Sequence, residues 1–219
     1  LLIDHGSPIK STLWLYSIQH NYFDIMQYLC RNFFDILTPN DINNIIKYIN
    51  IYGRIEILKW LSLNQYINIK NYVEEIKKSA CELGHHRIMK FILDYDFKKT
   101  VTNEHFEIAF NLDHFDVCDI LIREWPNKFN LSNHLNDSIN NLNLKKIQYL
   151  LSKDLRITNN QFINIIKANN VPILKSIFEF KHELHLSQGL VDASYNNLID
   201  IFEVIINQYP STTIFTFDK

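Results

Sequence analysis

The chain has 219 residues, of which 47% are hydrophobic and 21% charged, a composition typical of a folded protein rather than a disordered one. Its 22 basic and 24 acidic residues leave a formal net charge of -2, so no global positive field attracts nucleic acid or an anionic membrane. No uncharged apolar run reaches the roughly 18 residues of a membrane-spanning helix. The three cysteines show no CxxC motif and no even count that suggests a disulfide framework. We therefore expect a soluble, cytoplasmic protein with reduced core thiols, binding neither nucleic acid nor membrane.

The chain opens in the middle of an element. Its first residue is Leu1 rather than Met, and the apolar run that begins there is followed at once by Asp4, His5 and Gly6. This beginning predicts that the sequence is a piece of a longer chain.

A segment with the sequence pattern of a helix then recurs along the rest of the chain. Successive copies begin 27 to 32 residues apart, at the anchor residues Asn21, Gly53, Gly84, Asp113, Leu142, Asn169 and Asn197. Self-similarity at such a period is typical of repeat architectures. We predict a single repeat array over 1–219, with about seven repeats at roughly 10–40, 41–70, 71–100, 101–130, 131–157, 158–185 and 186–219.

Each copy of the segment has the pattern of a helix with one buried face. The positions four, five and eight residues after the anchor are apolar in all copies except at Lys146. Those offsets trace one face of a helix with 3.6 residues per turn. The aliphatic stem of Lys146 can cover the core while its ammonium reaches water.

A second pattern precedes each anchor and predicts a partner helix. The position four residues before the anchor is small in five copies, and the position seven before it is bulky and apolar in all except Lys77. Small side chains there permit close helix approach. Helix starts are predicted at residues whose hydroxyls can accept from first-turn amides: Ser11, Thr102, Ser132, Thr158 and Ser187. Thr158 and Gln161 also fit a capping box. Pro39 and Pro126 are expected in connectors, and Pro172 in the first turn of a helix.

The copies resemble ankyrin repeats. The segment 53–61 is similar to the second-helix consensus of that family, 21–30 and 84–93 look like weaker copies, and 79–84 resembles the end of a first helix. By the same resemblance, residues 1–9 would be the tail of a preceding repeat. No copy has the Thr-Pro-Leu-His opening, and the period is shorter than the usual one. The resemblance thus implies an all-α, ankyrin-like helix-hairpin solenoid with short or missing β-hairpin fingers. Another helical-hairpin solenoid is the structural alternative.

No motif predicts an active site. His182 and His185 are three apart rather than the four that a zinc-protease helix needs, and His85 and His86 diverge on a helix. The four glycines form no cluster that could wrap a phosphate. We therefore expect no enzyme, catalytic residue, cofactor or metal.

The remaining candidate is the outer face of the first helices, six and two residues before each anchor. Its mixed charge in the middle and apolar ends favour a protein partner. We predict a non-catalytic scaffold, monomeric within a longer chain, that binds a protein partner through a concave first-helix face containing Lys47, Lys78, Glu82, Glu107, Asn111, Asn136, Asn140 and Lys167. Three alternatives stay open: a substrate-capture module of a larger enzyme, a spacer without a ligand, and an ordinary solvated face.

Overall fold

A computed structural model describes residues 11–95, 101–180 and 184–208. Over these residues the regular structure consists of fourteen α-helices and two short 3-10 helices, and no strand occurs among them, so the prediction of an all-α protein is confirmed. The α-helices are α1 Thr12–Gln19, α2 Phe23–Phe33, α3 Pro39–Tyr52, α4 Ile55–Leu63, α5 Val73–Leu83, α6 His86–Asp94, α7 Asn103–Asn111, α8 Phe115–Glu124, α9 Leu131–Asn140, α10 Leu144–Leu151, α11 Asn159–Lys167, α12 Val171–Glu179, α13 Leu186–Tyr195 and α14 Ile199–Ile206. The 3-10 helices are η1 Phe34–Ile36 and η2 Ile69–Asn71.

The chain divides into two compact units. Unit 1 comprises residues 1–129 and contains α1 to α8, and unit 2 comprises residues 130–219 and contains α9 to α14. The single array over 1–219 stays a prediction. The predicted tail of a preceding repeat at residues 1–9 lies outside the described residues.

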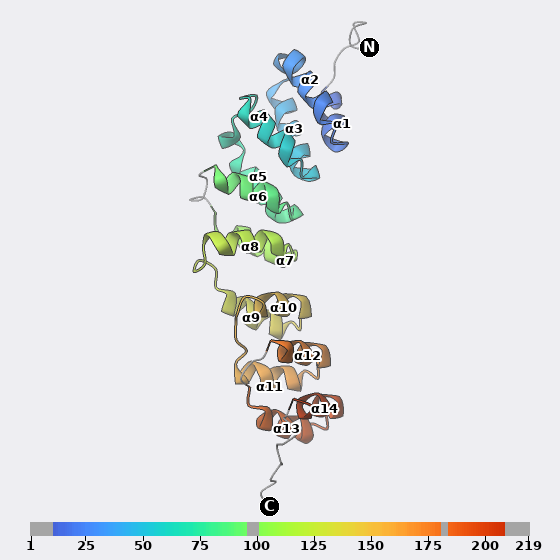
Figure 1. The fold of residues 1–219 in the computed structure, drawn as a ribbon, viewed down its shortest axis with the longest axis vertical. Coiled ribbons are helices and arrows are strands. Elements are labelled where there is room, and N and C mark those ends of the chain that lie inside the picture. The colour runs from blue at the N-terminus through green and yellow to red at the C-terminus, as the bar shows by residue number, and fades with distance from the viewer. Residues whose placement is uncertain (1–10, 96–100, 181–183, 209–219) are drawn as a thin grey trace, which may run out of the picture. The chain divides into compact units, whose positions relative to one another are not determined.

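Neighbouring helices pack in pairs within each unit (Figure 1). Each odd-numbered helix contacts the even-numbered helix that follows it, which makes seven pairs. In unit 1 the first helices α1, α3, α5 and α7 pack successively against one another, and so do the second helices α6 and α8. In unit 2 the same holds for α9, α11 and α13 and for α10, α12 and α14. Each hairpin therefore buries its apolar face against its neighbours, as in repeat proteins.

Every anchor residue lies in the turn between the two helices of a pair. All seven adopt left-handed backbone conformation, with φ between 51° and 71°. In six of these turns the amide after the anchor donates to the carbonyl five residues earlier, at 2.8 to 3.0 Å, which is the hydrogen bond of a Schellman motif. Glycine and asparagine tolerate this conformation, and they occupy five anchors, whereas Leu142 bears a Cβ without such compensation.

The predicted core columns are buried with few exceptions. All residues four and seven before the anchors are buried, including Lys77, whose side chain is 0% exposed although its charge marked it as a departure from the apolar pattern. Among the residues after the anchors, Ile25 of α2 is 50% exposed. Phe202 and Lys146 are half-buried.

Some predicted helix starts are wrong. Thr102 and Thr158 lie at the N-cap, as expected, and Thr158 forms the predicted capping box with Gln161. Thr102 forms a capping box with His105 that was not predicted. Ser11 lies at the N-cap of α1 without a side-chain hydrogen bond. However, α9 is capped by Asn130 rather than Ser132, because the Asn130 amide oxygen accepts from the Asn133 backbone at 3.1 Å. Likewise α13 begins after His185, two residues before Ser187.

The prolines follow the first-turn preference more closely than expected. Pro172 lies in the first turn of α12, as predicted. Pro39 is the first residue of α3 and not part of a connector, and Thr38 before it forms a capping box with Asp41. A proline at the first helical position loses no hydrogen bond, which explains the position of Pro39. Pro126 lies in the connector between α8 and α9.

Consecutive repeats of unit 1 are tied together at the turns. The residue after an anchor donates to a carbonyl at the end of the preceding first helix: Arg54 Nε to Ile18 at 2.9 Å, His85 Nε2 to Ile51 at 3.3 Å and His114 Nε2 to Glu82 at 3.0 Å. The two imidazole rings lie over Gly53 and Gly84, where a Cβ atom would come within 2.8 and 2.6 Å of ring atoms. These glycines are therefore required by the histidine of the next repeat as well as by their positive φ.

Candidate partner-binding surface

The predicted binding residues lie on the first helices of both units. Seven of the eight are exposed, and Glu107 is half-buried. Unit 1 carries Lys47, Lys78, Glu82, Glu107 and Asn111 on α3, α5 and α7, and unit 2 carries Asn136, Asn140 and Lys167 on α9 and α11. Within each unit the first helices pack side by side, so each of these two groups shares a face. Their role in binding stays a prediction.

A row of exposed apolar side chains follows the same face of unit 1. We call it the apolar stripe, and it consists of Tyr16, Ile51, Tyr52, Leu83 and Leu112. Tyr52, Leu83 and Leu112 are the residues directly before three consecutive anchors, at the ends of α3, α5 and α7. Tyr16, Leu83 and Leu112 are 55%, 43% and 52% exposed. Because stacked helices lie about 8–10 Å apart, the equivalent residues at the ends of α3, α5 and α7 lie about one helix spacing from one another.

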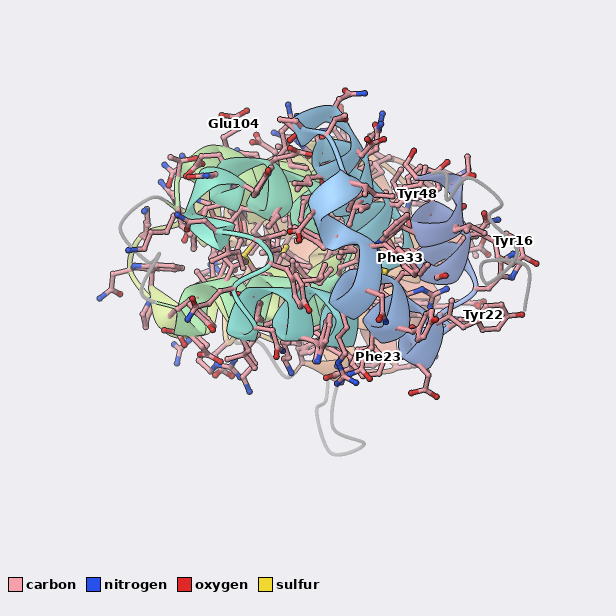
Figure 2. The ribbon with its side chains drawn as sticks, turned by 90° about the horizontal axis from the view of Figure 1, so that it is seen from above. Tyr16, Tyr22, Phe23, Phe33, Tyr48 and Glu104 are labelled. Atoms are coloured by element: carbon pink, nitrogen blue, oxygen red, sulfur yellow. The ribbon has the colours of Figure 1, made fainter. Side chains whose placement is uncertain are left out.

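Aromatic contacts order the stripe at the α1 end. The His20 ring lies 4.3 Å from the Tyr16 ring and stacks on Tyr22 at 5.6 Å between centroids. Tyr16 and Tyr22 project along the same edge of the first helix pair in Figure 2. On the next repeat the Arg54 guanidinium lies 5.8 Å from the Tyr52 ring centroid. Tyrosine and arginine side chains held in place by such contacts are typical of binding hot spots.

The charges beside the stripe nearly balance. Lys78 Nζ lies 4.0 Å from Glu82 Oε1, and both side chains remain largely exposed. An ion pair of this kind is screened by solvent and adds little to stability. The face therefore presents apolar side chains with charges of both signs rather than a basic patch for phosphates.

The corresponding positions of unit 2 are polar or small. The residues one and five before its three anchors are Asn141, Ala168, Asn196, Asp137, Asn164 and Asp192. Exposed apolar side chains occur instead at Val191 and Tyr195 of α13, which are 61% and 90% exposed. The apolar stripe is thus a feature of unit 1.

The face predicted from the sequence comprised the columns six and two residues before the anchors. Of the apolar stripe, these columns contain only Ile51. The column directly before the anchors reads His20, Tyr52, Leu83, Leu112, Asn141, Ala168 and Asn196. It changes from aromatic and aliphatic residues in the first four copies to polar or small ones in the last three. That change could have indicated the stripe from the sequence. Tyr16 and Tyr48, five residues before the first two anchors, gave the same indication.

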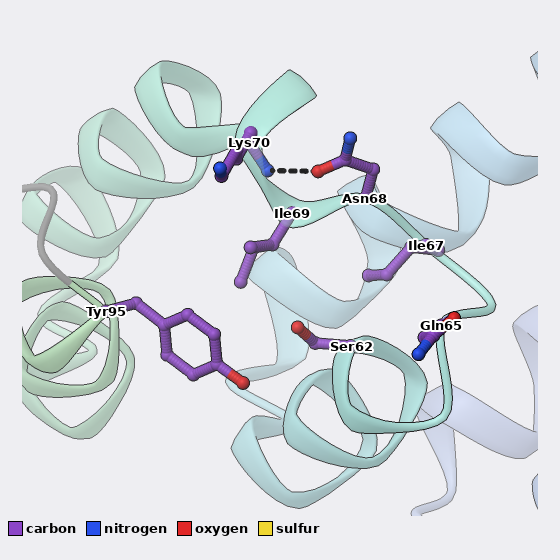
Figure 3. A pocket seen from close by; sticks show the side chains of 7 residues that line it. All are labelled: Ser62, Gln65, Ile67, Asn68, Ile69, Lys70 and Tyr95. Carbon is purple, nitrogen blue, oxygen red and sulfur yellow. Dashed lines mark hydrogen bonds between the residues drawn. The ribbon is translucent and has the colours of Figure 1, made fainter.

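A cavity of about 390 Å³ opens at the connector side of unit 1 (Figure 3). The hydroxyls of Ser62 and Tyr95 face it from α4 and from the end of α6, across from the buried Ile67 and Ile69. The backbone amide of Lys70 donates to Asn68 Oδ1 at 3.2 Å. The lining residues are Ser62, Gln65, Ile67, Asn68, Ile69, Lys70 and Tyr95. They include no carboxylate or histidine.

The cysteines lie in the core as thiols. Cys30, Cys81 and Cys118 are all buried. Burial raises the pKa of Cys30 and of Cys81 to about 12, so neither thiol ionises near neutral pH. A nucleophilic cysteine needs a lowered pKa and access to substrate, and these two residues have neither.

The histidine motifs do not assemble a metal site in the described part of the chain. No group of three or more His, Cys, Asp or Glu side chains suited to a metal ion occurs among the described residues. His182 and Glu183 lie outside them. His85 and His114 are engaged with backbone carbonyls between repeats.

None of the helices in the described ranges is both long and apolar enough to cross a membrane. Comparison with known proteins found no matching family model, no matching curated protein and no matching solved structure.

Proposed function

We propose that the chain is a non-catalytic scaffold that binds a protein partner through the first-helix face of unit 1. The observation that carries this proposal is the apolar stripe. Its side chains stay exposed on stacked helices, although burying a leucine or tyrosine would be favourable by about 1.5–3 kcal/mol per large side chain. A continuous exposed apolar row of this kind is typical of an interaction site.

The chemistry of this face supports a protein as the partner. Tyrosine and leucine side chains supply an apolar centre, and the polar residues Lys47, Lys78, Glu82 and Asn111 supply a rim. An apolar centre with a polar rim is the usual anatomy of protein–protein interfaces. The near balance of charge gives no support to a nucleic acid or membrane partner.

We also propose that the repeats are ankyrin-like. Support comes from the paired helices, from first helices packing on first helices, and from the left-handed glycine turns at Gly53 and Gly84. The three buried thiols support a reducing compartment such as the cytoplasm.

Site-specific photo-crosslinking tests the proposal. A photoreactive amino acid replaces Leu83 or Leu112 in the intact chain, which is then irradiated in an extract of the source cells. We expect the same protein to be captured from both positions, because both side chains lie on one exposed row.

The matched controls are Asn141 and Asn196, which occupy the corresponding position in unit 2. They should not capture that protein. Capture of the same protein from all four positions, or of no common protein from Leu83 and Leu112, would show that the stripe is not the binding surface.

A further inference from the structure

A histidine caps the first helix of the fourth pair. His105 is the third residue of α7, and its Nδ1 accepts from the Thr102 backbone amide at 3.2 Å and lies 2.9 Å from the Thr102 hydroxyl oxygen. Nδ1 can accept a hydrogen bond only while it carries no proton. The same position of α11 holds Gln161, whose side-chain oxygen accepts from Thr158 at 2.9 Å and does not titrate. The two capping boxes therefore differ in their response to acid.

The surroundings of His105 oppose a positive charge. The side chain is 7% exposed, and the fully buried Lys77 of the neighbouring α5 places its ammonium nearby, 2.7 Å from Glu74. Burial, and then the charge of Lys77, lowers the pKa of His105 below its ordinary value of 6.5. Lys128, which follows α8, acts in the same direction, whereas Glu74 on α5 and Glu104 on α7 act against it.

Protonation of His105 would therefore remove the acceptor of the cap and add a second positive charge beside a buried lysine. α5 and α7 pack directly against each other, so both effects fall on one helix–helix contact. We propose that His105 makes the packing of α7 against α5 acid-sensitive.

The direction of the effect follows from proton linkage. Above pH 6.5 the imidazole is neutral in both the folded and the opened state, and the joint has its full stability. As the pH falls below 6.5 the opened state takes up a proton that the folded state resists, so stability is lost. At pH 5.5, one unit below the ordinary pKa of histidine, the ratio of closed to open α7 falls severalfold. Because only one proton is taken up, this fall cannot exceed about tenfold.

Amide hydrogen exchange of the intact chain tests the proposal. We expect the protection of α7 amides, corrected for the intrinsic pH dependence of exchange, to fall severalfold between pH 7.5 and 5.5 in the wild type and to stay constant in His105→Gln. The matched control is His134→Gln, at the same distance before its anchor in α9, which should leave the response of α7 unchanged. Equal losses in the wild type and in His105→Gln would overturn the proposal.

A second measurement needs no variant. The imidazole of His105 is titrated by NMR in the wild-type chain, and we expect its midpoint below 6.5 together with loss of α7 amide signals over the same pH range. A midpoint at or above 6.5, or a titration that leaves the α7 amides unchanged, would contradict the proposed joint even if His105→Gln does not fold.

Discussion

A methyl group on Gly84 tests how neighbouring repeats of unit 1 are held together. Gly84 has φ +71°, and a Cβ atom there would lie 2.6 Å from Nδ1 of His114. The ring cannot stay in place, yet its Nε2–H donates to the Glu82 carbonyl at 3.0 Å. Gly84→Ala therefore strains the turn and displaces the tie to the next repeat at the same time.

Two contributions give the expected magnitude. An alanine in left-handed conformation costs about 1–2 kcal/mol, and loss of the hydrogen bond costs about 0.5–1.5 kcal/mol. We therefore expect Gly84→Ala to lower the free energy of unfolding of unit 1 by about 1.5–3.5 kcal/mol. When His114 is already alanine, only the conformational cost of about 1–2 kcal/mol remains, so the double-mutant cycle should show a coupling of about 1 kcal/mol.

Tryptophan fluorescence during urea unfolding measures this cycle in the intact chain. All three tryptophans, Trp14, Trp60 and Trp125, belong to unit 1, so their emission reports that unit and not unit 2. Gly53→Ala with His85→Ala provides a parallel cycle at the preceding repeat. Strict additivity in both cycles would refute the argument that the histidine rings make these glycines necessary.

The remaining predictions concern the core, the caps and the thiols. Leu61→Ala and Leu121→Ala should each destabilise unit 1 by about 2–5 kcal/mol in the same assay, because both side chains are fully buried. The exposed Leu83→Ala should change stability by less than about 0.5 kcal/mol, and a reversed order would contradict the assigned helix faces. Thr158→Ala should weaken α11 by about 1 kcal/mol, seen as faster amide exchange in that helix, since Thr158 accepts from the Gln161 amide. Unchanged exchange in α11 would mean that this cap adds nothing to stability. Because burial raises the pKa of Cys30 and Cys81 to about 12, iodoacetamide at pH 8 should label them only after urea unfolding, whereas equal labelling rates in native and unfolded chains would contradict their burial.

Much of the helical architecture could be predicted from the sequence. The repeat is visible because the same helix face recurs, and the columns four, five and eight residues after each anchor are buried with the exceptions of Ile25, Phe202 and Lys146. The left-handed turn was not predicted, although a column made mainly of asparagine and glycine is typical of it. Helix starts were less certain because serine and threonine compete with nearby asparagine for the N-cap, as at Asn130.

The rest depended on contacts that one sequence does not reveal. The burial of Lys77 depends on Glu74 and on the neighbouring α7, and a charge pattern alone predicts a solvated residue there. The need for Gly84 becomes clear only once His114 lies over it. The apolar stripe has a sequence signal, but whether a leucine at the end of a helix is exposed or buried is decided by the next repeat.

The most direct test of the proposed function is the affinity of the protein captured at Leu83 for variants of the intact chain. The charged double variant Leu83→Asp/Leu112→Asp changes the centre of the stripe, and Asn141→Asp/Asn196→Asp makes the matched change in unit 2. Calorimetry measures the affinity of each variant. We predict at least about a tenfold loss of affinity for the first variant, because central apolar residues dominate binding energy. The second variant should stay within about twofold of the wild type. Equal affinities for both variants and the wild type would contradict the assignment of the binding surface to the apolar stripe.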